Sequence, residues 1–98
     1  MTERDFQQIV TDLCDWLRLP WYHTHDSRRS NAGFPDLVIV GKSAIIFAEL
    51  KSATGRVTPA QTEWYRHLFE AGQHVYLWRP EDIYDIKSIL EKLAKGTL

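Results

Sequence analysis

The sequence contains a single cysteine, Cys14, among its 98 residues. One thiol cannot form an intrachain disulfide or a cysteine-based zinc cage, and so little cysteine is typical of a protein in a reducing cytoplasm. The chain also lacks any apolar run near the roughly 20 residues that span a bilayer, and its first residues, MTERDFQQ, are too polar for a signal peptide. These absences predict a cytoplasmic protein with no membrane partner.

An excess of positive charge is missing as well. The 12 lysines and arginines are balanced by 13 aspartates and glutamates, which gives a formal net charge of -1. Nucleic-acid-binding domains usually carry a basic surplus, so this composition argues against nucleic acid unless a metal ion neutralises some carboxylates. The length, with 44% hydrophobic residues, predicts a single domain over residues 1–98.

No repeat, low-complexity tract or linker interrupts the chain. Helical periodicity of apolar residues, bounded by capping residues, predicts helices over about residues 3–18, 58–72 and 83–95. Apolar runs between turn residues predict strands over residues 21–25, 37–40, 44–50 and 74–78. The fold class is therefore α/β in the order αβββαβα. The second and third strands should form a hairpin buried on both faces, and the last strand, after a helical crossover, should join them in parallel to give a mixed sheet flanked by helices.

Charged residues lie beside the two apolar runs of this hairpin, within GFPDLVIVGKSAIIFAELKS at residues 33–52. In an antiparallel hairpin the start of the first strand lies next to the end of the second. If Gly41 pairs with Ala44 at the turn, Asp36 stands directly opposite Glu49. The sequence therefore predicts two carboxylates side by side at the edge of the core.

Two interpretations of these carboxylates remain open on the residues alone. Lys51 lies two positions after Glu49 and shares its face of the strand, so the two could form a solvated ion pair worth at most about 1 kcal/mol. Alternatively, because Asp36 and Glu49 repel each other, one of them takes up a proton unless a cation lies between them. Two carboxylates, a backbone carbonyl and water suit Mg²⁺, and an adjacent lysine can orient a hydroxide or stabilise charge on a phosphate.

These residues carry a family resemblance. The pattern resembles the signature of the PD-(D/E)XK nucleases and is formed here by Pro35, Asp36, Glu49, Leu50 and Lys51. More narrowly, the chain resembles the VRR-NUC domain, the virus-type replication and repair nuclease family. The segments that carry this resemblance are Glu3 with Gln7, GFPDLVIV, AELKSATGRVTPAQ and AGQHVYLWRP. It covers about residues 3–85 and implies the restriction-endonuclease-like fold, whose core order is αβββαβ.

The resemblance also implies a metal site. Asp36 and Glu49, with the carbonyl of Leu50, would bind Mg²⁺ or Mn²⁺, and Lys51 would hold or activate the attacking water. No small-molecule cofactor is implied.

Further catalytic roles are implied for Glu3, in the first helix, and for Gln61, in the helix that follows the hairpin. Each has a simpler explanation: Glu3 is an acid favoured by the dipole of a first helical turn, and Gln61 completes a capping box with Thr58. Together with Gln61, Tyr65 resembles the QxxxY motif of related exonucleases, although an aromatic residue at helical spacing often belongs to a core.

Three arginines are candidates for contacts with DNA phosphates: Arg28 and Arg29 before the hairpin and Arg56 after it. Solvated loops would explain them as well. His23 and His25 alternate on a strand and suggest a metal site of their own, but an all-oxygen site already accounts for the chemistry.

The sequence thus predicts a metal-dependent, structure-specific DNA endonuclease. Stand-alone VRR-NUC domains of this size resemble phage-type Holliday-junction resolvases that act as homodimers on four-way junctions. The alternatives are a flap, single-strand or exonuclease activity on the same fold, and a DNA-binding module without catalysis.

Overall fold

The computed structural model describes residues 1–25 and 31–98. Its elements, in chain order, are α1 (Glu3–Trp16), β1 (Trp21–His23), β2 (Leu37–Val40), β3 (Ile45–Leu50), α2 (Pro59–Glu70), β4 (His74–Trp78), η1 (Pro80–Asp82) and α3 (Ile83–Lys95). The predicted order αβββαβα is confirmed, with the short 3-10 turn η1 added before the last helix.

The strands form one mixed sheet in the order β1-β2-β3-β4. Strand β2 is antiparallel to β1 and β3, and β4 runs parallel to β3, as its helical crossover predicts. At the hairpin turn, Gly41 N–H donates to the carbonyl of Ala44 at 2.9 Å, and Leu37 pairs with Ala48. The predicted register of the hairpin is therefore confirmed.

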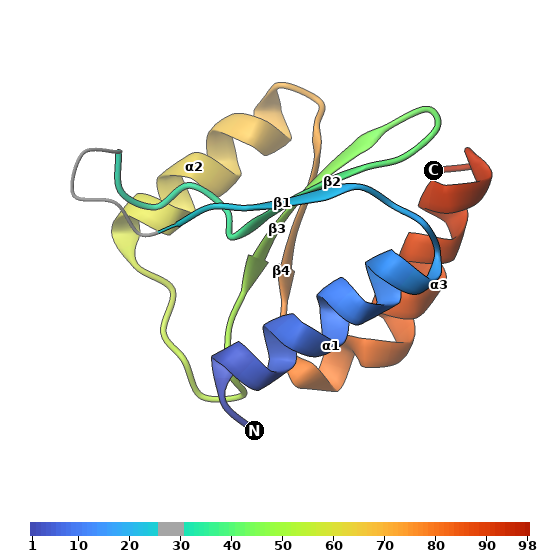
Figure 1. Ribbon diagram of the computed structural model, residues 1–98. Helices are drawn as coiled ribbons and strands as arrows, with labels where there is room; N and C mark the ends of the chain where they lie inside the picture. Colours follow the sequence, from blue (N-terminus) through green and yellow to red (C-terminus); the bar gives the residue numbers. More distant parts are fainter. Residues whose placement is uncertain (26–30) are drawn as a thin grey trace.

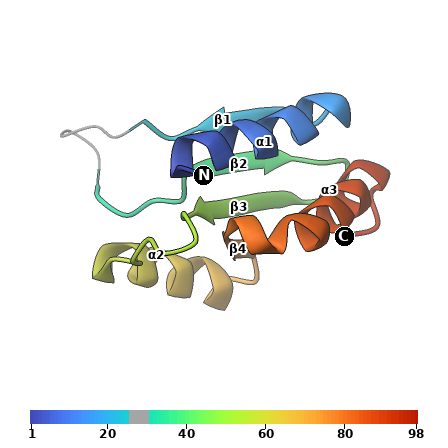
Figure 2. The same ribbon diagram turned by 90° about the horizontal axis from the view of Figure 1, so that it is seen from below.

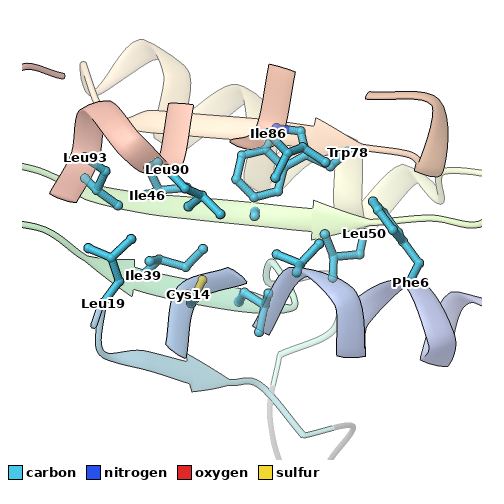
Figure 3. Packing of buried hydrophobic residues seen from close by; sticks show 13 residues of the cluster. Phe6, Cys14, Leu19, Ile39, Ile46, Leu50, Trp78, Ile86, Leu90 and Leu93 are labelled. Carbon is cyan, nitrogen blue, oxygen red and sulfur yellow. The ribbon is translucent and has the colours of Figure 1, made fainter. Parts of the chain in front are cut away.

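The helices lie on both sides of the sheet: α1 and α3 on one side and α2 on the other (Figures 1 and 2). The hydrophobic core fills the space between the sheet and the α1 and α3 side (Figure 3), and its fully buried members include Phe6, Val10, Cys14, Leu37, Ile39, Ile46, Leu50, Ile86, Leu90 and Leu93. A typical apolar side chain of this kind contributes about 1.5–3 kcal/mol when buried. This main hydrophobic core lies on one face of the sheet, the face that α1 and α3 cover.

The expectation that the hairpin is buried on both faces is wrong. Val40 and Ile45 point away from the core and are each 41% exposed. The reason is that α2, which has no buried residue of its own, covers only part of that face. Among the described residues, no helix has the length and apolar character needed to cross a membrane.

The helix ends follow local chemistry. Thr2 caps α1, because its Oγ1 accepts from the Asp5 N–H at 3.0 Å and its own N–H donates to Asp5 at 3.3 Å. Helix α1 stops at Trp16, two residues before the predicted boundary, because Arg18 adopts a left-handed conformation with φ 59°. The chain can then turn into β1.

Candidate active site

The open end of the β2–β3 hairpin carries Asp36 and Glu49. Asp36 comes directly before β2, and continuing the register of Leu37 with Ala48 places it opposite Glu49. The Oδ2 atom of Asp36 accepts a hydrogen bond from the Leu50 N–H at 2.8 Å. This bond closes the hairpin and fixes one oxygen of the carboxylate, which leaves the other oxygen for a ligand.

Strand alternation decides where the charged side chains point. Ala48 and Leu50 face the core, so Glu49 and Lys51 face the α2 side. Both are nonetheless covered, because Glu49 is 5% and Lys51 9% exposed. The Lys51 N–H donates to the carbonyl of Trp78 at 3.0 Å and so extends the β3–β4 pairing. A solvated ion pair at a strand end is therefore the wrong interpretation of Glu49 and Lys51.

The pKa of Glu49 is raised to about 9, chiefly by burial and then by a hydrogen bond with Asp36 and by the negative charge of Asp36. The positive charge of Lys51 acts against this rise, and the negative charge of Glu3 adds to it. Without a cation, the Asp36–Glu49 pair keeps a proton at neutral pH. A divalent cation could take the place of that proton.

Gln61 connects the start of α2 with this pair. Its N–H donates to Thr58 Oγ1 at 3.2 Å, and its Oε1 accepts from the Thr58 N–H at 2.9 Å, which completes a capping box. Its Nε2 donates to Glu49 Oε1 at 3.2 Å. Capping and a role beside Glu49 were alternatives in the sequence, and one side chain makes both contacts.

Two contacts hold the start of α2 and the loop before Asp36 together. A Cβ atom on Gly33, whose φ is +91°, would lie 2.4 Å from the carbonyl carbon of Ala60, so only glycine fits there. Next to it, the ring of Phe34 packs edge-on against the rings of Trp64 and Phe47. The ring centroids are 5.1 Å and 6.1 Å apart, respectively. The placement of Asp36 and of Gln61 therefore depends on the same junction.

Arg79, which the sequence analysis did not single out, holds the loop that follows Lys51. Its Nη1 donates to the carbonyls of Ser52 at 2.7 Å and Gly55 at 2.9 Å. Both acceptors are backbone atoms, so no residue type in the loop marks this contact. The only signal was the position of the arginine directly after the last strand, inside the WRP segment.

The remaining predicted residues are more scattered. Glu3 is exposed at the first position of α1, and its negative charge contributes to the raised pKa of Glu49. Arg56 is exposed in the loop between β3 and α2, and Arg28 and Arg29 lie outside the described residues. Tyr65 is 37% exposed and is not a core residue.

The donor set is compatible with a hard divalent cation. Within residues 1–25 and 31–98, no group of three or more histidine, cysteine, aspartate or glutamate side chains is arranged to hold a metal. Side chains of this region therefore offer two carboxylates, Asp36 and Glu49, and other ligands would be the Leu50 carbonyl and water. Mg²⁺ commonly binds through one or two carboxylates and keeps several waters, so these residues fit it.

Comparisons with known proteins agree with this geometry. The sequence profile of the VRR-NUC domain matches residues 1–81. A solved structure described as a VRR_NUC domain protein has the same fold, with a TM-score of 0.71 and 23% sequence identity over 97% of this chain and 89% of the other. No curated protein matches the sequence. The chain belongs to the VRR-NUC domain family, and it is a nuclease domain of the virus-type replication and repair class.

Proposed function

We propose that the protein is a divalent-metal-dependent DNA endonuclease that hydrolyses phosphodiester bonds in branched DNA, in particular four-way junctions, as a homodimer. The observation that carries the metal-dependent part is the juxtaposition of Asp36 with Glu49 in a buried site, where one carboxylate must hold a proton or a cation. Preference for branched DNA and dimerisation rest on the resemblance to stand-alone VRR-NUC domains.

Asp36 and Glu49, with the Leu50 carbonyl, would hold Mg²⁺ or Mn²⁺. Such an ion, when bound, lowers the pKa of a water ligand and neutralises negative charge on the phosphate. The chain prepares the site in advance: the Leu50 N–H orients Asp36, and the Gln61 amide orients Glu49. Preorganised ligands of this kind need no rearrangement during the reaction.

Lys51 supplies the positive charge of the site. Its side chain shares the face of Glu49 and is almost fully covered, so its charge is weakly screened by water. There it stabilises the negative charge that develops on the phosphate, or holds the attacking water. Arg56, in the loop that Arg79 anchors, would contact the DNA backbone.

A dimer suits the substrate. A chain of 98 residues covers a short length of DNA, whereas a two-fold dimer presents two active sites to a junction of two-fold symmetry. Paired cuts on opposite strands would then follow from the symmetry of the assembly.

The proposal is tested with end-labelled four-way junction, flap, linear duplex and single-stranded DNA, incubated with Mg²⁺, Mn²⁺ or a chelator. We expect paired symmetric nicks at the junction, no cleavage in chelator, and a dimer by light scattering. Cleavage of flap or single-stranded DNA instead would retain the metal site and contradict the resolvase. Binding of DNA without cleavage of any substrate would favour a non-catalytic module.

A further inference from the structure

A cavity of about 290 Å³ opens beside the candidate active site. It lies between α2, the loop before α2, and the ends of β3 and β4, and it is lined by Glu49, Val57, Gln61, Thr62, Tyr65 and Leu77. Glu49 and Leu77 are register partners in the parallel β3–β4 pair, so their side chains share the face of the sheet that α2 covers. The cavity therefore continues directly from the active-site carboxylate.

The described walls of the cavity are unsuited to a phosphate. Among residues 1–25 and 31–98, no lysine, arginine or histidine lines the cavity, so no described wall residue would pair with an anion. Val57, Leu77 and the ring of Tyr65 offer apolar and aromatic surface instead. The volume of about 290 Å³ lies just below the range of about 300–1,000 Å³ for ligand pockets, so one small, flat, uncharged group fits it.

We propose that this cavity receives the base of a nucleotide next to the scissile phosphate, with the base stacked on Tyr65. The inference rests on the proposed nuclease function. A phosphate that reacts beside Asp36 and Glu49 has nucleosides on either side, and the base is the flat, uncharged part of a nucleotide. Stacking on an aromatic ring is the common way in which proteins hold an unpaired base.

The Gln61 amide offers little selection among bases. Gln61 already uses Oε1 on Thr58 and Nε2 on Glu49, so its amide is largely occupied. Stacking alone tolerates any base, because every base has a π-face. The cavity should therefore accept all of the bases with similar affinity.

A base inside a duplex is paired and stacked and cannot enter this cavity. Extruding a base costs least where it is mismatched or already unpaired. Branch points, frayed ends and single strands offer such bases, whereas intact duplex does not. Occupation of the cavity would thus select for distorted DNA without any contact that depends on sequence.

The first test is a scan of abasic nucleotides on either side of the cleaved bond in whichever DNA the wild-type protein cleaves. We expect one abasic position to lower single-turnover cleavage by roughly 5- to 100-fold, which corresponds to the loss of one base–aromatic stack. If cleavage is normal at every abasic position, the cavity does not hold a base.

The second test uses the Tyr65→Ala and Tyr65→Phe variants. On intact DNA, Tyr65→Ala should lower the single-turnover cleavage rate by the same factor as the abasic position does. On the sensitive abasic substrate, Tyr65→Ala should cleave as fast as the wild-type protein does. Tyr65→Phe should keep the wild-type rate because it keeps the ring. Phe69→Ala is the matched control: Phe69 is an exposed aromatic residue on the same helix, outside the cavity. An equal loss for Tyr65→Ala on both substrates would mean that Tyr65 acts only through the fold, and would overturn the proposal.

A binding test separates this inference from the nuclease function. The fluorescence of 2-aminopurine, placed at successive positions around the branch point, is measured in chelator, where no cleavage occurs. We expect the wild-type protein and Phe69→Ala to quench one position, and Tyr65→Ala to leave it bright. Quenching by a protein that cleaves no DNA would contradict the proposed function but not the base pocket, and cleavage without quenching at any position would contradict the pocket alone.

Discussion

The Nε2 atom of Gln61 donates a hydrogen bond to Oε1 of Glu49 at 3.2 Å, while the Oε1 atom of Gln61 caps α2 through the Thr58 N–H at 2.9 Å. One side chain thus joins the start of a helix to a buried carboxylate on the sheet. Any movement of α2 would also change the environment of Glu49. The stability of the helix start and the geometry of the candidate active site are therefore coupled.

The two roles of Gln61 can be separated by mutation. Gln61→Glu keeps an acceptor for the Thr58 N–H but cannot donate to Glu49, whereas Gln61→Ala loses both bonds. We expect Gln61→Glu to lower cleavage about 10- to 100-fold, as for the loss of a hydrogen bond to a charged group. Gln61→Ala should in addition lower the free energy of unfolding by about 1 kcal/mol, measured in urea. The exposed Gln73→Glu is the control, and a full cleavage rate for Gln61→Glu would show that the Glu49 contact is dispensable.

Replacing Asp36 tests the metal site directly. Asp36→Asn keeps an oxygen that can accept from the Leu50 N–H, so folding should be preserved. Cleavage should fall by at least about two orders of magnitude, because a charged ligand is lost. In Lys51→Ala, cleavage should fall by a similar factor, with DNA binding largely retained. The matched control is Asp12→Asn, an exposed aspartate on α1, and cleavage by either active-site variant at the wild-type rate would contradict the site.

The pKa of Glu49 predicts a pH dependence of stability in the metal-free protein. This pKa is raised from 4.5 to about 9, so between these values the native state binds the proton that the unfolded state has lost. The free energy of unfolding should therefore fall as pH rises from about 5 to 9, by at most about 1.4 kcal/mol per pH unit.

Two comparisons check the origin of this slope. Glu49→Gln should flatten it, because the titrating group is gone. Mg²⁺ should oppose it in the wild-type protein, because the ion binds the deprotonated pair. Thermal unfolding at several pH values gives both results, and an unchanged slope in Glu49→Gln would assign the effect to another group.

The contact of Gly33 with Ala60 predicts a large effect of a small substitution. Gly33→Ala adds a methyl group 2.4 Å from the Ala60 carbonyl carbon, in addition to the cost of about 1–2 kcal/mol for a positive φ. Gly72→Ala is a matched control, since Gly72 has φ +79° and open space around its missing Cβ. We expect Gly33→Ala to lower both stability and cleavage, and Gly72→Ala to lower stability by the backbone cost alone. Equal stabilities of the two variants would mean that the Ala60 contact relaxes freely.

Arg79 should order the loop between β3 and α2. Arg79→Ala removes two hydrogen bonds to the carbonyls of Ser52 and Gly55, so stability should fall by about 1–3 kcal/mol and amide exchange over residues 52–57 should accelerate. Arg66→Ala is the control, because Arg66 makes solvent-exposed ion pairs with Glu63 and Glu70, which contribute little to stability. Unchanged exchange in Arg79→Ala would show that the loop is held by other contacts.

The sequence by itself determined the order of elements, the hairpin register and the caps at Thr2 and Thr58, because these depend on local periodicity and on neighbours a few residues apart. It also placed Asp36 opposite Glu49, since a hairpin register follows from its turn. The extent of burial, the uncovered sheet face at Val40 and Ile45, and the exposed position of Tyr65 followed only from how α2 packs on the sheet.

Tertiary structure alone decided the long-range contacts. Gln61 and Glu49 are 12 residues apart, and the partners of Arg79 are backbone carbonyls 24 and 27 residues away, which have no residue-specific signal in the sequence. Such contacts depend on the positions of whole elements, so no local pattern can encode them. For the same reason the burial that raises the pKa of Glu49 is a property of the assembled fold, although the glutamate itself was visible in the sequence.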